Sequence, residues 1–264
     1  MTFHNDATSC YDRIIIALAN LVARRFGLPE EICRLHGVTL EQMRYHISTA
    51  IGISEESYKH SNESPVYGTG QGSCASPSVW LQICYVLFDC HDQQSYGANY
   101  SSPDGTIKFK ESMTGFVDDT KGQTNDQTST AAMPLLQLIA RMQEDAQLWG
   151  DLLHVSGGAL EISKCNYYVM HWEFKPSGIP KLAKNLNTTL RIENGDRTAT
   201  VTLTNDAITV AHKTLGTWKS AARDQKKQVT ELALKSNEYA RTIMASPITR
   251  HDNWTAITRS TFRG

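Results

Sequence analysis

The sequence predicts an α+β fold, in which antiparallel strands pack against amphipathic helices. Several long segments place apolar residues at helical spacing, whereas shorter segments alternate between apolar and polar residues as strands do. The sequence Glu193-Asn194-Gly195-Asp196 lies between two β-prone runs and is typical of a hairpin turn. The chain has 264 residues, of which 40% are hydrophobic, and this suffices for a sizeable core in one large domain or one domain with an appendage.

The first half of the chain is expected to contain a strand that ends at Asp6, followed by three helices. Apolar residues at helical spacing define the first helix, and Gly27 and Pro29 end it. Thr39 precedes the second helix as a candidate N-cap, and Pro77 lies in the first turn of the third, where proline is tolerated. The helices are expected over residues 11–26, 40–50 and 76–93, with a polar loop over residues 54–65.

The second half of the chain is expected to combine strands with a long helix. Alternating residues predict strands over residues 106–110 and 113–118. An amphipathic helix is expected over residues 129–153, and Ser156-Gly157-Gly158 ends it. The remaining expectations are a loop over residues 94–105, an aromatic strand over residues 165–174, a hairpin over residues 190–203 and a basic helical region over residues 215–244.

Charge is balanced over the whole chain but divided along it. The formal net charge is -1, with 26 Lys and Arg against 27 Asp and Glu. Residues 211–264 hold ten basic and four acidic residues, so this tail carries +6 and the remainder carries −7. The asymmetry suits a body whose carboxylates hold metal and a separate surface that meets phosphates. A solvated basic helix is the alternative explanation of the tail.

The cysteines and the hydropathy of the chain indicate its compartment. None of the six cysteines has the paired spacing of a zinc site, and Cys84, Cys90 and His91 lie on an apolar segment where burial is expected. The chain shows neither a secretory leader nor an uncharged apolar run of about 18 residues. We therefore expect an intracellular protein of the cytoplasm or nucleus, neither secreted nor inserted in a membrane.

The segment Gly115-Phe116-Val117-Asp118-Asp119-Thr120 ends an apolar run in two adjacent carboxylates. Neighbouring side chains of a strand point to opposite faces, so only one of these acids can face a given site squarely. Like charges at a hairpin tip repel each other, and a divalent cation removes this cost because hard ions such as Mg²⁺ prefer carboxylate oxygens. A surface turn without metal is the alternative.

Three further motifs accompany the paired acids. They are Asn5-Asp6-Ala7-Thr8-Ser9-Cys10-Tyr11-Asp12-Arg13, Tyr67-Gly68-Thr69-Gly70-Gln71-Gly72-Ser73-Cys74-Ala75-Ser76-Pro77 and Ser156-Gly157-Gly158-Ala159-Leu160-Glu161-Ile162-Ser163-Lys164-Cys165. In this order, the four motifs resemble the palm of reverse transcriptases from retroelements that lack long terminal repeats. The paired acids match that family's tyrosine-x-Asp-Asp signature with Phe116 in place of tyrosine, and residues 71–77 match its Gln-Gly-x-x-x-Ser-Pro motif. The resemblance covers residues 5–219.

The resemblance implies a polymerase palm, an antiparallel sheet packed on helices, over residues 1–210. The start of a basic, helical, thumb-like region would follow over residues 211–264. The implied activity is RNA-directed DNA polymerisation, a two-metal nucleotidyl transfer from dNTPs to a primer 3′-OH on an RNA or DNA template. Asp6 and Asp118 would hold two Mg²⁺ ions, with Mn²⁺ as a substitute, and Asp119 would assist them as a third catalytic residue. A helix N-terminal acid is the alternative role for Asp6.

Further site residues follow from the same resemblance. Tyr11 would screen the sugar 2′ position and select deoxynucleotides, and Lys164 would lie near the triphosphate; a core tyrosine and a solvated lysine are the alternatives. Gln71 and Gly72 would lie beneath the nascent base pair, where glycine allows close approach. The residues expected to meet the primer–template backbone are Lys219, Arg223, Lys226 and Lys227.

The family's fingers, which precede the first motif and grip the triphosphate, have no counterpart in this chain. An endonuclease or RNase H segment is not recognisable either. We therefore expect a retrotransposon product whose activity is impaired by truncation unless a partner supplies the fingers or other retroelement domains. The alternative is a catalytically inactive remnant that binds nucleic acid. A metal-dependent hydrolase built on the three aspartates would leave the Gln71 motif unexplained.

Overall fold

The computed structural model describes residues 1–59, 67–70, 73–126, 134–183, 186–193, 195, 197–214, 216–245, 247, 249 and 252. The chain divides into two compact units. The first comprises Met1–Tyr167 and Asn187–Asn205, and the second comprises Tyr168–Leu186 and Asp206–Gly264. The expected boundary at residue 210 lies near the crossing at Asn205, whereas the excursion of Tyr168–Leu186 into the second unit was not predicted.

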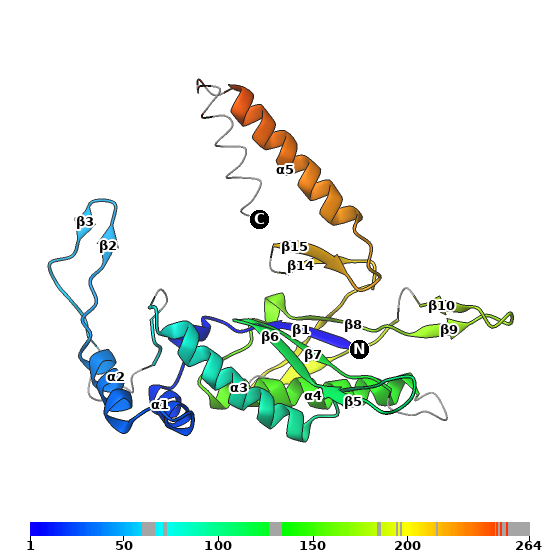
Figure 1. Ribbon diagram of the computed structural model, residues 1–264, viewed down its shortest axis with the longest axis horizontal. Coiled ribbons are helices and arrows are strands. Elements are labelled where there is room, and N and C mark those ends of the chain that lie inside the picture. Colours follow the sequence, from blue (N-terminus) through cyan, green and yellow to red (C-terminus); the bar gives the residue numbers. More distant parts are fainter. Residues whose placement is uncertain are drawn as a thin grey trace. The chain divides into compact units, whose positions relative to one another are not determined.

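A five-stranded sheet forms the centre of the first unit (Figure 1). Its strand order is β13-β8-β1-β7-β6. The central strand β1 pairs antiparallel with β7, β7 pairs antiparallel with β6, and β13 pairs parallel with β8. The strands are β1 (Thr2–Asp6), β6 (Met113–Phe116), β7 (Asp119–Gln123), β8 (Asn166–Tyr168) and β13 (Thr204–Asn205).

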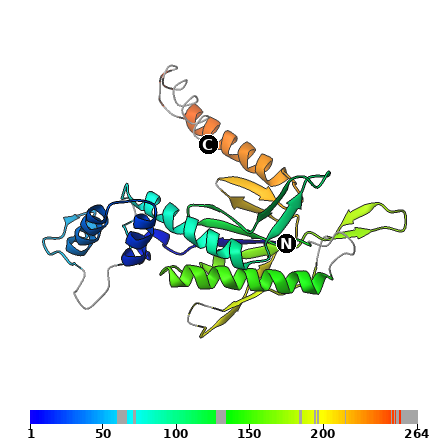
Figure 2. The same ribbon diagram turned by 60° about the horizontal axis from the view of Figure 1, so that its bottom comes forward.

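Two long helices, α3 (Ser76–Gln94) and α4 (Leu135–Val155), pack against each other and against this sheet (Figure 1 and Figure 2). Helix α3 contacts β6 and α4 contacts β7. Helix α1 (Ile16–Arg25) packs against α3 and against α2 (Glu30–Gln42). The combination of helices with antiparallel-rich sheets agrees with the predicted α+β class.

Helix α4 buries one face because its apolar residues recur at helical spacing. The buried members of this face are Met142, Ala146, Trp149 and Leu153. The largest of them, Trp149, is 0% exposed, and its Nε1 donates a hydrogen bond of 2.8 Å to the Oδ1 of Asn5 on β1. The same oxygen accepts a hydrogen bond from the hydroxyl of Thr120 on β7. The buried Asn5 side chain therefore links α4 to β1 and β7, and its acceptor oxygen is satisfied.

A second buried acceptor, the carboxylate of Asp145 on α4, holds the chain that follows α3. It accepts hydrogen bonds from the backbone N–H groups of Tyr96 and Gly97 at 2.8 and 3.1 Å, and from the hydroxyl of Thr124 at 2.6 Å. Charge-assisted bonds of this kind stabilise a buried carboxylate. The helix thereby fixes the start of the segment that leads into the hairpin of β4 (Ala98–Ser101) and β5 (Lys108–Glu111).

His91 lies buried on α3, as the apolar pattern predicted. Its Nε2 is 3.0 Å from the carbonyl oxygen of Asp145, and its ring packs edge-on against Trp149 with 6.2 Å between the ring centroids. Burial lowers the pKa of His91, and this outweighs the raising effects of the carbonyl oxygen and charge of Asp145. The folded protein therefore favours the neutral imidazole. Cys84 is buried too, and Cys90 is half-buried.

We expect the free energy of unfolding to decrease as the pH falls below 6.5, the ordinary pKa of a histidine side chain. The unfolded chain takes up a proton at His91 near its ordinary pKa of 6.5, whereas the folded chain takes it up only at lower pH. The loss is at most about 1.4 kcal/mol for each pH unit in this range. Urea denaturation at about pH 7.5 and about pH 5.5, with wild type beside His91→Gln, measures the effect. If His91→Gln loses as much stability between the two pH values as the wild type does, protonation of His91 is not the cause of the loss.

Short hairpins extend the first unit. They are β2 (Ser48–Thr49) with β3 (Gly52–Ile53), β4 (Ala98–Ser101) with β5 (Lys108–Glu111), and β11 (Arg191–Glu193) with β12 (Thr200–Thr202). Two glutamines of α4 bind the backbone of β11: Gln143 Oε1 accepts from Arg191 N at 2.7 Å, and Gln147 Oε1 accepts from Glu193 N at 2.8 Å. Helix α4 thus supplies hydrogen-bond acceptors for N–H groups on the edge of β11 that has no neighbouring strand in its two-stranded sheet.

The described residues of the second unit form two hairpins and one long helix. The hairpins are β9 (Trp172–Phe174) with β10 (Pro180–Leu182), and β14 (Ala211–Thr214) with β15 (Thr217–Ser220). The helix is α5 (Lys226–Ala245), which packs against β15. In the part of the chain that the structure describes, none of the helices has the length and apolar character needed to cross a membrane.

Several element boundaries differ from the predictions for physical reasons. The helix expected over residues 40–50 is wrong: α2 covers Glu30–Gln42, because Pro29 and the acids Glu30 and Glu31 suit a helix N-terminus. Thr39 consequently lies inside α2, where its hydroxyl donates to Leu35 O at 2.7 Å instead of capping. The helix expected from residue 11 begins at Ile16, after a 3₁₀ turn η1 (Cys10–Asp12).

Three further expectations need correction. The loop over residues 94–105 contains β4, whose Tyr100 stacks on Phe109 of β5 with 4.9 Å between ring centroids. The single strand over residues 165–174 is divided into β8 and β9. The basic region after residue 215 begins with β15 and becomes helical only at Lys226, where Asp224 accepts a hydrogen bond from the Lys226 N–H as a cap.

Candidate active site

The paired acids lie at the tip of the β6–β7 hairpin. Phe116 and Asp119 are paired across the two strands, and Val117 and Asp118 form the turn between them. Val117 has a φ of 58°, a left-handed conformation that is a genuine outlier for a β-branched residue. The indole of buried Trp80 donates a hydrogen bond of 2.5 Å to the Val117 carbonyl. The tip is therefore held in a costly conformation by its surroundings, as functional sites frequently are.

The end of β1 brings Asp6 to this tip. Asp6 is the register partner of Asp119 across β1 and β7, and the backbone N–H of Ala7 donates to the Asp118 carbonyl at 3.1 Å. Partial burial, followed by the charges of Asp118 and Asp6, raises the pKa of Asp119, whereas Lys164 lowers it. The three carboxylates are thus close enough to repel one another.

Backbone hydrogen bonds connect the glycine-rich motif to the segment after β1. Gly68 N donates to Ile14 O at 2.8 Å, and Thr69 N donates to Tyr11 O at 2.8 Å. Gly68 has a φ of +80°, and a Cβ there would lie 2.7 Å from the Asp12 backbone. A glycine is therefore needed for this contact. Gln71 and Gly72, predicted beneath the nascent pair, lie outside the described residues.

The motif that follows α4 closes on the same segment. Ser156 O accepts from Ile15 N at 3.2 Å, and Ala159 O accepts from Thr8 N at 2.9 Å. Gly157 has a φ of +94°, and a Cβ there would lie 2.2 Å from the Arg13 carbonyl oxygen. Four motifs that are far apart in sequence thus meet around residues 6–15.

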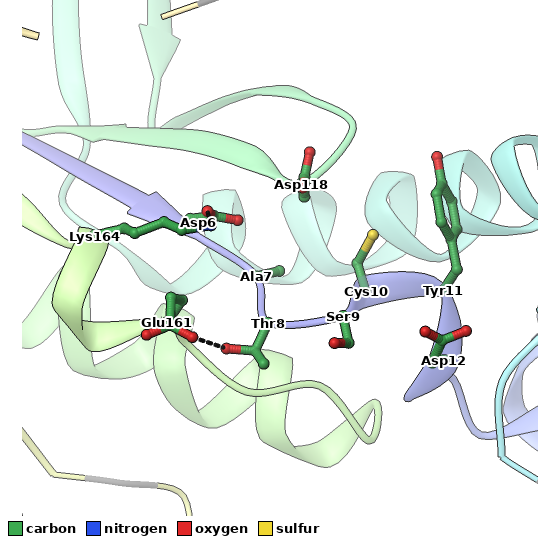
Figure 3. Close-up of a pocket in the computed structure, with 10 residues that line it drawn as sticks. All are labelled: Asp6, Ala7, Thr8, Ser9, Cys10, Tyr11, Asp12, Asp118, Glu161 and Lys164. Carbon is green, nitrogen blue, oxygen red and sulfur yellow. Dashed lines mark hydrogen bonds and ion pairs between the residues drawn. The ribbon is translucent and has the colours of Figure 1, made fainter. Parts of the chain in front are cut away.

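A cavity of about 260 Å³ opens where these segments meet (Figure 3). Its lining includes four of the predicted site residues, namely Asp6, Tyr11, Asp118 and Lys164. Asp119 is not among the residues that line this cavity. The lining also includes Cys10 and Glu161, which were not predicted as site residues.

Lys164 forms an ion pair with Asp6, with 2.5 Å between Nζ and Oδ2. The lysine side chain is 65% exposed and the aspartate side chain 12% exposed. The hydrogen bond to Asp6 raises the pKa of Lys164, and the charges of Asp6, Glu161 and Asp118 raise it further. The lysine is therefore protonated at neutral pH and acts as the cation of the site.

Glu161 and Cys10 differ in what they contribute. Glu161 accepts a hydrogen bond of 3.2 Å from the hydroxyl of Thr8 (Figure 3). It accepts another of 2.6 Å from the hydroxyl of Ser163, and the two bonds lower its pKa. Burial, followed by the charge of Asp118, raises the pKa of Cys10 to about 11. The thiol is consequently neutral at physiological pH and is unsuited to nucleophilic chemistry. The only sequence signal for Glu161 as a site residue was its position in the motif over residues 156–165, three residues before Lys164.

Tyr11 stands at the opposite end of the cavity from Lys164 (Figure 3). Its side chain is half-buried, and burial together with the nearby Cys10 and Asp118 raises its pKa. The ring is therefore a neutral apolar wall of the cavity with a hydroxyl at its edge.

The predicted nucleic-acid-binding residues all lie in the second unit. Lys219 is on β15, Arg223 has a φ of 60° in the turn that follows, and Lys226 and Lys227 begin α5. All four are exposed, and the Nζ of Lys227 lies 4.9 Å from the centroid of the Trp218 ring. These cations gather on one short stretch of chain.

The donor atoms of the cavity fit a hard cation. Mg²⁺ is commonly bound through one or two carboxylates while it keeps several waters, and Asp6 and Asp118 supply two carboxylates to one polar cavity. Within the described ranges, no group of three or more His, Cys, Asp or Glu side chains is arranged to hold a metal.

Comparison with known proteins gives no family assignment. The sequence matches no protein-family model and no curated protein.

Proposed function

We propose that the first unit is the palm of a reverse transcriptase, an RNA-directed DNA polymerase of a retrotransposon. The supporting observation is the convergence of the four motifs. The glycine-rich segment (residues 67–70) and the segment that follows α4 (residues 156–165, the post-α4 segment) form hydrogen bonds with the backbone of residues 6–15. In addition, Asp6 and Asp118 line one cavity. A hydrolase that needs only the three aspartates would not require the glycine-rich segment to close on Tyr11 and Ile14.

Asp6 and Asp118 are the residues that would hold Mg²⁺. Two such ions, when bound, neutralise charge on the attacking and leaving oxygens of nucleotidyl transfer. Asp119 lies beside Asp6 in the sheet register and orients the pair. Lys164 provides a protonated amine for the triphosphate or for the leaving pyrophosphate. The Tyr11 ring forms the wall that excludes a 2′-hydroxyl.

The second unit would bind the primer–template backbone. Lys219, Arg223 and Lys226 present exposed cations, and phosphate contacts of this kind are sequence-independent and weaken with salt. The substrates under this proposal are dNTPs and a primer on an RNA or DNA template.

A catalytically inactive protein that binds nucleic acid is the second candidate. The ion pair between Lys164 and Asp6 favours it, because an aspartate that already has a cation can persist without metal.

Primer extension distinguishes the two candidates. Purified protein with Mg²⁺, dTTP and oligo(dT) on a poly(rA) template should incorporate nucleotide, and incorporation should stop when a chelator removes the metal. The same protein with a poly(dA) template measures template preference. Folded protein that binds the primer–template but extends nothing would overturn the polymerase proposal and support the inactive binding protein.

A further inference from the structure

Lys164 occupies the position of a cation at the candidate metal site. Its Nζ lies 2.5 Å from Asp6 Oδ2, so the ammonium and the carboxylate form a charge-assisted hydrogen bond. The carboxylate that it neutralises is largely withdrawn from water, whereas the lysine is mostly exposed. An aspartate in this setting needs a positive partner, because burial of an unpaired charge is costly.

The backbone keeps this lysine beside Asp6. Lys164 ends the 3₁₀ turn η2 (Ile162–Lys164), and its N–H donates to Glu161 O at 2.9 Å. Glu161 N in turn donates to Asp6 O at 2.9 Å. The turn is therefore anchored to the end of β1 by the main chain, while the exposed side chain can leave without disturbing that anchor.

We propose that Lys164 is a resident counter-ion, which a divalent cation must displace from Asp6 before it can bind Asp6 and Asp118. This inference rests on the proposed role of these two aspartates as metal ligands. A single ammonium and a hard divalent ion compete for the same carboxylate oxygens, so the lysine weakens metal binding. Metal binding frees the ammonium, which then becomes available for an anionic ligand such as a triphosphate.

The competition has two measurable consequences of opposite sign. Removal of the lysine charge should tighten metal binding, because the ion no longer has to break the pair. It should also destabilise the metal-free protein, because Asp6 then faces Asp118 and Asp119 without a counter-ion. Added metal should restore that stability, since the ion takes the place of the ammonium.

Isothermal titration of the full chain with Mn²⁺ tests the proposal, with wild type beside Lys164→Met. We expect the variant to bind about three- to tenfold more tightly, and to melt about 2 °C lower without metal. Its melting temperature should rise more on addition of Mn²⁺ than that of the wild type. Lys164→Arg, which keeps the charge, should retain the weak affinity of the wild type.

Lys121→Met is the matched control, because it removes one positive charge from the same sheet. Lys121 lies on β7 opposite His4, two positions from the Asp6–Asp119 pair, and none of the ion pairs found among the described residues joins it to Asp6. Its affinity for Mn²⁺ should stay within about twofold of the wild type. An equal gain in Lys121→Met and Lys164→Met would overturn the proposal, because net charge alone would then explain both.

The remaining outcomes separate this proposal from the proposed function. Binding that is lost in Asp118→Asn but equal in wild type and Lys164→Met overturns the counter-ion role and keeps the metal site. An absence of binding in both wild type and Lys164→Met overturns the counter-ion role and the metal site together. Binding by Lys164→Met alone supports the counter-ion role in its strongest form.

Discussion

Replacement of Asp118 by asparagine is expected to reduce Mg²⁺-dependent primer extension by at least about a thousandfold, since the loss of several kcal/mol of charge stabilisation has this effect on a rate. Asparagine has nearly the same size but carries no charge. The main-chain bond from Ala7 N to the residue 118 carbonyl is unaffected, so the hairpin tip should keep its place beside β1. The loss would then report the carboxylate itself.

Asp12→Asn is the matched control for this prediction. Asp12 also lines the cavity, but it lies in η1, beyond the carboxylates that we propose to hold the metal. The control should extend primers within a few-fold of the wild-type rate, and both variants should show wild-type circular dichroism. Activity that survives in Asp118→Asn would remove polymerisation at this cavity, and with it any metal-dependent hydrolysis there.

The local structure of each motif could be predicted from the sequence, because each motif has a local signal. An apolar run that ends in two acids predicts a strand and a turn, and glycines before and after helices predict tight connections. The choice of Asp6, Tyr11, Asp118 and Lys164 as site residues came instead from the resemblance of the four motifs to a polymerase palm, and all four residues line one cavity. The convergence follows from the central position of β1, between β7 and β8 in the sheet.

The pairing of Lys164 with Asp6 could not be predicted in the same way. The two residues are separated by 158 positions, and their contact depends on the η2 turn and on the bond from Glu161 N to Asp6 O. The strained φ of Val117 likewise depends on Trp80, which lies on another element. Contacts of this kind come from tertiary packing, which local patterns do not encode.

The predicted element boundaries were wrong where two local signals competed. Residues 28–50 contain both a proline-led, acidic helix start and a later apolar stretch, and the earlier signal defines α2. The excursion of residues 168–186 into the second unit had no local signal, because Trp172 and Phe174 alternate as they would in a core strand. Both are exposed on the β9–β10 hairpin instead.

Gly157→Ala is expected to have the largest effect on stability among simple substitutions near the site. A Cβ there would lie 2.2 Å from the carbonyl oxygen of Arg13 and 2.9 Å from a side-chain carbon of Ile15. Backbone atoms cannot move aside as the end of a flexible side chain can, so the segment after α4 would have to separate from residues 13–15. We expect a loss of about 3–5 kcal/mol in the free energy of unfolding, from overpacking and from alanine at a positive φ.

Gly27→Ala separates these two costs, because Gly27 follows α1 as Gly157 follows α4. The two glycines have φ values of +91° and +94°, but a Cβ at Gly27 would meet no atom within 4 Å. Gly27→Ala should therefore lose only the conformational part, about 1–2 kcal/mol, in urea denaturation. The difference between the variants measures the steric contact between Gly157 and Arg13. Equal losses of the free energy of unfolding in the two variants would mean that the close contact between Gly157 and residues 13–15 is not needed. The cavity would then not depend on this contact for its shape.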